Sequence, residues 1–253
     1  AIAACLAEDS CIALYGHYYY SEEWGLFLHH VPVHVVLIWP LFILGEYHYL
    51  VSGLRLPVCG SGSWAEGVTL RGSFCFVDTT LLAYLIEVYC VKAGLWSWRH
   101  SNCLGVPWLG AVGWAFFTTP AVLLLSMWEA ATAAGRSPPG PMLLLIVPTA
   151  IATLHCSLLI TWHVLGARHL AHVSVPAGAT ACGILVIQGF YQVATVSLHR
   201  WRPPAPLLLS EELPRLLACS IVAALWVFKG GLDLGTGLVS AASLVRVATF
   251  SMG

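Results

Sequence analysis

The most informative absence in this sequence is charge. Of the 253 residues, only 11 are Lys or Arg and 12 are Asp or Glu, which is 9% of the chain. A soluble domain of ordinary composition carries about 25% charged residues, so this chain lacks the polar surface that such a domain needs. The net charge of −1 also excludes the basic surface of a nucleic-acid-binding protein, and we expect no nucleic-acid partner.

Several motifs with recognisable chemistry are missing as well. The nine cysteines are scattered without a Cys-x-x-Cys pair, and most lie in apolar runs, where they act as small fillers. The sequence has no aspartate-rich motif for magnesium and diphosphate, no glycine-rich phosphate loop, no Gly-x-Ser-x-Gly turn and no arginine ladder. These absences argue against prenyltransferases, nucleotide-binding enzymes, α/β-hydrolases and voltage sensors.

Long apolar runs dominate what is present, because 58% of the residues are hydrophobic. A helix needs about 20 apolar residues to cross a membrane. We therefore predict an all-α protein: a polytopic integral membrane helical bundle of six to eight transmembrane helices, forming one domain over residues 1–253 without an internal repeat. Because the first residue is Ala1 and not methionine, six is a minimum count. Residues 1–15 are a candidate for the end of an earlier helix, but Glu8 and Asp9 interrupt this apolar run. The six predicted spans are residues 29–51, 72–92, 104–128, 142–165, 174–198 and 214–232, with a weaker run at 234–250.

Ionisable residues inside these runs are candidates for function, because an ionisable group in hydrocarbon is costly and usually faces the bundle interior. Glu87, Asp78 and Glu46 are the candidate catalytic residues, and Glu87 is the strongest because it lies well inside its run. Tyr84 shares its helix face. The alternative for Glu87 is a neutral, hydrogen-bonded packing residue, for which Tyr84 is a candidate partner. Asp78 lies on the opposite face of the same helix, so it does not form a local pair with Glu87.

Polar side chains also line one predicted span near the C-terminal end. Gln188, Tyr191 and Gln192 are within the run 174–198. We predict that they form hydrogen bonds with a substrate; the alternative is that they join neighbouring helices.

The eleven histidines raise the possibility of a metal site. His30 and His34 are four residues apart with His29 beside them, and His169 and His172 are three apart. This pattern is similar to part of a membrane di-iron oxygenase, but such enzymes use more histidine boxes than this sequence contains. We therefore predict no metal site, since interfacial hydrogen bonding accounts for these residues.

The segment "GLWSWRHSNCLGVPWLGAVGW" (94–114) concentrates four tryptophans between two apolar runs. Indole prefers the membrane–water interface, where its ring is half-buried and its N–H remains hydrated. This preference explains Trp96, Trp98 and Trp108, but it does not explain Trp114, which lies deeper in the next run.

Three segments together resemble a known family. "EVYCVKAGLWSW" (87–98), "LGVPWLGAVGW" (104–114) and "YGHYYYSEEWGLFLHHVPVHVVLIW" (15–39) are similar to the membrane carotenoid-biosynthesis proteins that include the acyclic carotenoid (bacterioruberin-type) hydratases. The resemblance covers roughly residues 8–114, with Glu8 as a loose match to an acidic residue of the family. The chain departs from the family pattern at Val88, Gly110 and Ala83, where the family has proline, asparagine and a second acid.

The resemblance implies an enzyme that protonates a C=C bond of a lipophilic terpenoid or carotenoid. Water then captures the cation, which is hydration, or a second double bond captures it, which is cyclisation. Such a hydratase (a lyase) or cyclase needs an acid in a dry pocket and aromatic faces beside the cation. The expected partners are the isoprenoid substrate and membrane lipid, with no cofactor, and the oligomeric state is left open. Glu87 is the expected acid, and the expected substrate-binding aromatic residues are Tyr84, Trp39, Trp96, Trp98 and Trp114.

Two other functions compete with this one. A transporter or a non-catalytic subunit of a membrane complex would use its intramembrane acids to line a path or to bind partner helices. A histidine-metal membrane oxidoreductase would use the histidines instead. Isotope transfer, co-purification and elemental analysis distinguish the three.

Overall fold

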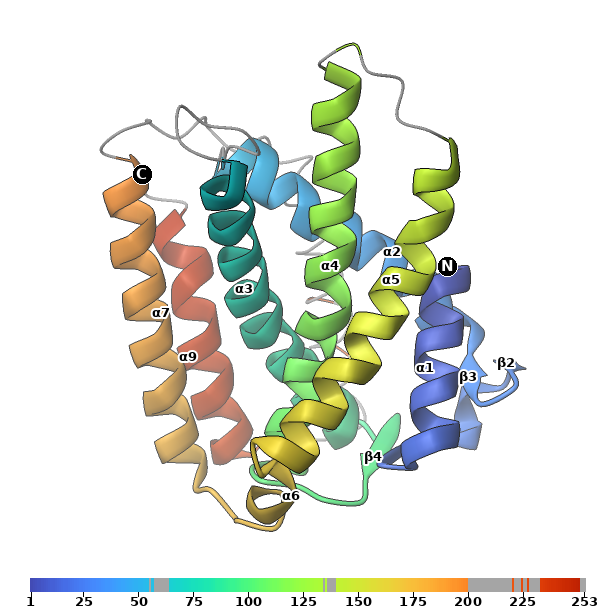
Figure 1. Cartoon of the computed structure of the whole chain (residues 1–253). Helices are drawn as coiled ribbons and strands as arrows, with labels where there is room; N and C mark the ends of the chain where they lie inside the picture. Colours follow the sequence, from blue (N-terminus) through green and yellow to red (C-terminus); the bar gives the residue numbers. More distant parts are fainter. Residues whose placement is uncertain are drawn as a thin grey trace.

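The structure is a computed structural model that describes residues 1–54, 56, 64–133, 135, 140–199, 220, 224, 227 and 233–250. Within this part of the chain the fold is mostly helical (Figure 1). Five segments are long and apolar enough to cross a membrane, and they match the first five predicted spans. These segments are Val33–Val51, Gly67–Lys92, Trp108–Thr132, Leu144–Val164 and Ala177–Thr195.

The two remaining apolar runs have different outcomes. The predicted span at 214–232 lies almost entirely outside the described residues. The weaker run at 234–250 is helix α9 (Leu234–Phe250), whose apolar part, Leu234–Ser243, is shorter than a span.

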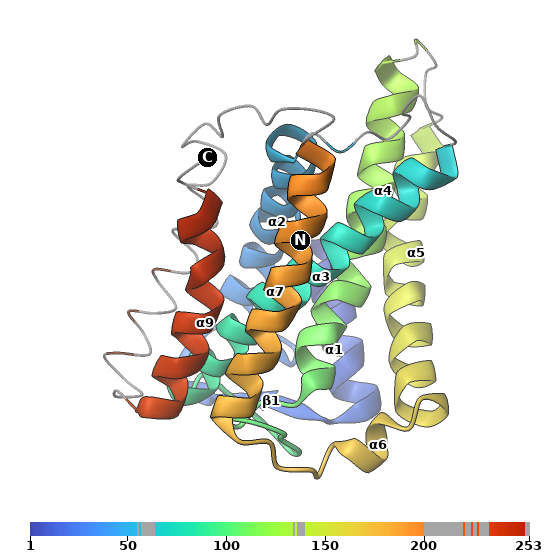
Figure 2. The same cartoon turned by 90° about the vertical axis from the view of Figure 1, so that its left-hand side faces the viewer.

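The helices form one bundle in which sequence neighbours pack side by side. Figures 1 and 2 show α9 beside α7, and α4 between α3 and α5, while α1 lies on the far side of the bundle from α7 in Figure 1. The π-helical segments η2 (Tyr49–Gly53) and η3 (Ile160–Val164) extend α2 and α5. The helix bounds are α1 Ile2–Tyr15, α2 Val33–His48, α3 Trp64–Lys92, α4 Trp108–Ala133, α5 Gly140–Leu159, α6 Ala167–Leu170 and α7 Ala177–His199.

Helix α1 is continuous, so the run at 1–15 is helical even though Glu8 and Asp9 interrupt its apolar residues. The helix carries both acids and ends at Gly16, which has φ 55 and whose N–H donates to the Ile12 carbonyl. Glycine adopts this left-handed conformation without the steric cost that a Cβ brings. The two acids are tolerated because they leave the helix in different directions: Glu8 is buried and Asp9 is half-buried.

Short strands modify the predicted all-α fold. Strand β1 (Tyr18–Tyr20), directly after α1, pairs antiparallel with β4 (Trp96–Trp98), directly after α3. This pairing lies at the lower end of the bundle in Figures 1 and 2. After the 3-10 turn η1 (Glu22–Trp24), strands β2 (Phe27–Leu28) and β3 (Val31–Pro32) form a hairpin that leads into α2. Strands of two or three residues leave no usable periodicity in a sequence, so the sequence analysis did not find them.

Asn102 fixes the loop between β4 and α4. Its side-chain NH₂ donates to the carbonyls of Leu170 and Val173 at 2.6 and 3.1 Å, and its side-chain oxygen accepts from the Trp108 N–H at 3.0 Å. The loop therefore holds the start of α4 against the segment between α6 and α7.

We expect Asn102→Asp to lower the free energy of unfolding by about 1–3 kcal/mol. The substitution keeps the acceptor for Trp108 but replaces the donor with an oxygen that faces two carbonyls. Thermal unfolding in detergent measures the loss. The exposed neighbour Ser101 provides the control, because Ser101→Ala should leave the melting temperature unchanged. An unchanged melting temperature in Asn102→Asp would contradict the role given to this side chain.

Candidate functional site

Glu87 is surrounded by three tryptophans. Trp96 Nε1 and Trp98 Nε1 donate to Glu87 Oε2 at 2.6 and 2.9 Å, and Trp114 Nε1 donates to Oε1 at 2.9 Å. The first two indoles are on β4 and the third is on α4, while Glu87 itself is in the last two turns of α3 and is 3% exposed. Three of the four tryptophans of the segment 94–114 therefore converge on one buried carboxyl group.

A second carboxyl group has an equivalent environment. Glu8, on α1, is 8% exposed. Its Oε1 accepts a hydrogen bond from Trp39 Nε1 at 2.9 Å. Its Oε2 accepts hydrogen bonds from the hydroxyl groups of Tyr20, at 3.1 Å, and Tyr18. The tyrosines are on β1 and the tryptophan is on α2, so Glu8, like Glu87, is held by two aromatic residues of a strand and one of a helix.

The two environments contact each other ring to ring. Trp39 and Trp114 lie with ring centroids 4.5 Å apart. The β1–β4 pairing brings the others together, with centroid separations of 4.7 Å for Tyr18 and Trp98 and 5.6 Å for Tyr20 and Trp96. Every ring that donates to one acid therefore contacts a ring that donates to the other. We name this cluster the acid-pair cage; its residues are Glu8, Glu87, Tyr18, Tyr20, Trp39, Trp96, Trp98 and Trp114.

The cage is built from two copies of one motif, so the prediction of no internal repeat is wrong. Each copy begins with Glu-x-x-Cys on a helix, which is followed by a glycine in the left-handed conformation. Aromatic residues stand two and four positions after this glycine. A Val-Pro pair comes next, with a tryptophan seven positions after the proline. The strand register pairs Tyr18 with Trp98 and Tyr20 with Trp96 about the central pair Tyr19 and Ser97, as a local two-fold axis requires. The copies are Glu8, Cys11, Gly16, Tyr18, Tyr20, Val31, Pro32 and Trp39, and Glu87, Cys90, Gly94, Trp96, Trp98, Val106, Pro107 and Trp114.

The copies differ in the chemistry of their donors. An indole N–H only donates, whereas a phenol hydroxyl both donates and accepts. Three N–H donors favour the ionised form of Glu87. Around Glu8, the two tyrosine hydroxyl groups can also accept the proton of a neutral carboxyl group. Burial raises the pKa of Glu8, and the hydrogen bonds from Tyr18, Trp39 and Tyr20 offset this rise only in part. Because hydroxyl groups that can accept a proton surround only Glu8, this acid is the better suited of the two to hold one.

Gly110 gives the Trp98 ring its place beside Glu87. A Cβ atom at Gly110 would lie 2.6 Å from Trp98 Cζ2 and 2.9 Å from Cη2. A shift of the ring would disturb its hydrogen bond to Glu87 and its packing on Tyr18. The glycine that stands where the resembled family has asparagine is thus required by the packing of this site.

We expect Gly110→Ala to lower the free energy of unfolding by about 1–3 kcal/mol through overpacking, although alanine alone favours a helix by about 1 kcal/mol. Gly113→Ala is the matched control on the same helix, since a Cβ there meets only Leu158 Cδ2 at 3.7 Å. Tryptophan fluorescence and thermal unfolding should change in the first variant and not in the second. Equal melting temperatures for the two variants would contradict this account of Gly110.

Tyr84 is turned away from Glu87. Its hydroxyl group donates to the Cys103 carbonyl at 3.2 Å, and its ring stacks on Trp108 at 4.7 Å. Tyr84 is therefore not the partner of Glu87, because the three indoles occupy that carboxyl group. The alternative of a hydrogen-bonded packing residue stays open.

The other two candidate catalytic acids are not at the level of the cage. Asp78 is buried on α3 and is nine residues from Glu87, which is about 13 Å along a helix axis. Glu46 is buried on α2 and is seven residues from Trp39, about 10 Å along the axis. The predicted set of three catalytic acids therefore does not form one site, and only Glu87 belongs to the cage.

The polar residues of α7 lie in other clusters. Gln188 donates to the Ser243 carbonyl at 3.1 Å and so joins α7 to α9. The Tyr191 hydroxyl group lies 3.5 Å from that of Tyr49, and its ring contacts Phe74 at 4.9 Å. Gln192 is half-buried on the same helix. For Gln188 this placement favours the alternative in which it joins helices.

Sequence reasoning gave too little weight to Glu8. The signal that finds it is the repeat, because aligning the two Val-Pro-x₆-Trp segments also aligns the two Glu-x-x-Cys segments. The repeat is hidden by the exchange of Tyr for Trp and by one extra residue between Glu8 and Gly16 compared with Glu87 and Gly94.

No family model, curated protein or solved structure matches this chain. The resemblance to membrane carotenoid-biosynthesis proteins therefore stays a prediction, and the chemistry of the acid-pair cage is the basis for a functional proposal.

Proposed function

We propose that the protein is an integral membrane enzyme that protonates a C=C bond of a lipophilic isoprenoid, giving hydration or cyclisation. The observation that carries the proposal is the acid-pair cage: two buried carboxyl groups with different donor sets, surrounded by six aromatic rings in mutual contact. The roles below follow from this difference.

The large apolar side chains on the outside of the bundle support the membrane location. Exposed apolar surface of this extent is unfavourable in water and favourable in lipid. These side chains belong to three of the helices that are long enough to span, and they include Leu37 and Leu41 on α2, Leu144 and Leu145 on α5, and Phe190 and Val193 on α7.

Glu8 is the proposed proton donor. Its proton adds to one carbon of the double bond, and the positive charge develops on the neighbouring, more substituted carbon. Water then adds to this cation and loses a proton, or a second double bond adds to it and a proton leaves the ring. In either case one proton returns to Glu8, so the enzyme is unchanged and no redox partner or cofactor is required.

Glu87 is the proposed counter-ion. Its three N–H donors favour a carboxylate, which stabilises a nearby cation in a medium of low dielectric constant. The aromatic faces add cation–π stabilisation of about 2 kcal/mol for a desolvated cation. Tyr18, Tyr20, Trp98 and Trp114 are half-buried, so these residues are the accessible part of the cage. This assignment replaces the expectation that Glu87 is the acid.

The test is isotope transfer by the purified protein in lipid nanodiscs. Linear isoprenoids, including an acyclic carotenoid, are incubated in D₂O and separately in H₂¹⁸O, and the products are analysed by mass spectrometry. Deuterium at the chain terminus indicates protonation, and ¹⁸O separates hydration from cyclisation. Glu129→Gln provides the control protein, because Glu129 is at the far end of α4 and bonds to Tyr47. Absence of deuterium transfer to every substrate, including lipids that co-purify with the protein, would overturn the proposal.

A further inference from the structure

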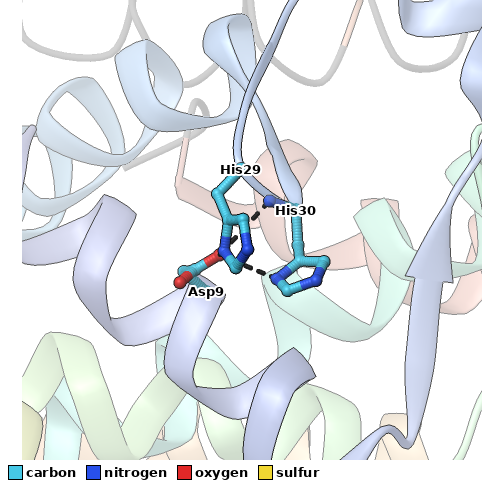
Figure 3. A group of neighbouring side chains, drawn as sticks. All are labelled: Asp9, His29 and His30. Atoms are coloured by element: carbon cyan, nitrogen blue, oxygen red, sulfur yellow. Dashed lines mark hydrogen bonds and ion pairs between the residues drawn. The ribbon is translucent and has the colours of Figure 1, made fainter.

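A second group of functional side chains lies outside the acid-pair cage, at the surface. Asp9 projects from α1 toward His29 and His30, which form the turn between β2 and β3 (Figure 3). The Nδ1 atoms of the two histidines lie 2.7 and 3.0 Å from the same atom, Asp9 Oδ1, and the His30 backbone N–H donates to that oxygen at 3.2 Å. Three side chains from two separate segments thus direct their ligand atoms to one point.

We propose that Asp9, His29 and His30 form a binding site for a divalent transition-metal ion of the zinc type. Two imidazole nitrogens and one carboxylate oxygen are typical ligands of Zn²⁺, Co²⁺ and Ni²⁺. Ca²⁺ and Mg²⁺ prefer oxygen ligands only, so the donor set disfavours them. Three protein ligands leave at least one coordination position for water.

The spacing of the ligand atoms suits such an ion. A tetrahedral ion with bonds of about 2.1 Å places its ligands about 3.4 Å apart. The three ligand atoms here all lie within 4.8 Å of one another. Small rotations of the two exposed rings therefore suffice to move from the hydrogen-bonded arrangement to coordination.

Proton balance sets the conditions for binding. A neutral histidine that donates from Nδ1 to Asp9 moves its proton to Nε2 when Nδ1 binds the metal, whereas a protonated histidine releases one proton to solvent. Metal binding therefore releases protons from any protonated ligand and weakens as the pH falls. Asp9 is ready to act as a ligand: burial opposes its ionisation, but the hydrogen bonds from His29 and His30 outweigh burial and lower its pKa.

The site lies where a bound ion would connect α1 with the β2–β3 hairpin. Asp9 follows Glu8 directly on α1, and the β2–β3 hairpin leads into α2, which carries Trp39, a donor to Glu8. An ion bound to Asp9 and the two histidines joins α1 to this hairpin. The site therefore clamps together the two segments that supply Glu8 and one of its hydrogen-bond donors. The metal site does not depend on the proposed enzyme activity.

The test is metal binding by the full chain in detergent, after chelator treatment and removal of any polyhistidine tag. We expect isothermal titration with ZnCl₂ to give one site per chain, CoCl₂ to give the visible absorption of a bound Co²⁺ ion, and MgCl₂ to give no binding. His29→Ala, His30→Ala and Asp9→Asn should each weaken zinc binding by about 10-fold or more. His163→Ala removes an exposed histidine elsewhere and should leave the affinity unchanged.

A second readout separates a lost ligand from a misfolded variant. Zinc should raise the melting temperature of the wild type and of His163→Ala, and should not raise that of a His29→Ala, His30→Ala double variant that melts cooperatively in its absence. Equal zinc affinity in the double variant and the wild type would overturn the proposal, and so would equal binding of Mg²⁺. Either result would leave Asp9 and the histidines as a hydrogen-bonded turn, and the isotope test of the acid-pair cage would be unaffected.

Discussion

Glu8→Gln should transfer deuterium from D₂O to a linear isoprenoid at least about 10²-fold more slowly than the wild type, which is the usual contribution of a general acid. Glutamine keeps the size of the side chain and an oxygen that accepts from Trp39, but it carries no acidic proton. Product formation in single-turnover experiments is the measurement. Glu129→Gln is the matched control and should keep the wild-type rate.

Glu87→Gln should also slow turnover, but for a different reason, and a second measurement distinguishes the two. A stable ammonium analogue of the isoprenoid cation mimics the charge that develops after protonation. It should bind Glu8→Gln about as well as the wild type, because the Glu87 carboxylate remains. It should bind Glu87→Gln more weakly by about 10-fold or more, because the counter-ion is lost.

The opposite pattern would contradict the assignment of roles. If Glu8→Gln keeps its rate and Glu87→Gln loses it, Glu87 is the acid, as the sequence analysis expected, and the argument from the tyrosine hydroxyl groups fails. Tyr18→Phe and Tyr20→Phe add a further check. Each removes a group that can accept the proton of Glu8, so each should lower the deuterium-transfer rate without changing the affinity for the ammonium analogue.

The sequence predicted the part of the fold that depends on hydropathy. Five predicted spans coincide with helices because each carries enough apolar residues to be recognised independently of its neighbours. Residues 1–15 were only a candidate for the end of a further helix, because the two adjacent acids interrupt the apolar run. On a helix, however, adjacent side chains differ in direction by about 100°, so Glu8 enters the cage while Asp9 stays half-buried outside it.

The site could be predicted only in part, because helical periodicity gives the face of a residue and not its partner. Glu87 and Tyr84 differ in direction by about 60° on α3. This small difference is enough for Tyr84 to reach Cys103 while Glu87 meets the indoles of β4 and α4. The partner of each acid depends on the pairing of β1 with β4, a contact between residues nearly 80 positions apart that only the repeated motif reveals.

The largest effect on stability is expected for Glu87→Leu. Leucine fits the volume of the side chain but leaves three indole N–H groups without their acceptor. Each unsatisfied buried donor costs about 1–3 kcal/mol. The variant also lacks the desolvation penalty of a buried carboxylate, which offsets part of the destabilisation. We therefore expect a net loss of a few kcal/mol, measured by reversible unfolding in mixed detergent micelles.

A double-mutant cycle assigns this loss to the indole hydrogen bonds. Trp114→Phe removes one donor to Glu87. In the wild type this breaks a hydrogen bond, whereas in Glu87→Leu the bond is already absent, so the two substitutions should couple by about 1–3 kcal/mol. Trp108→Phe is the matched control: Trp108 follows the same loop but stacks on Tyr84, outside the cage, and should be additive with Glu87→Leu. Additivity of both tryptophan variants would mean that the indoles pack around position 87 without stabilising its charge. The counter-ion role of Glu87 would then lose its physical basis.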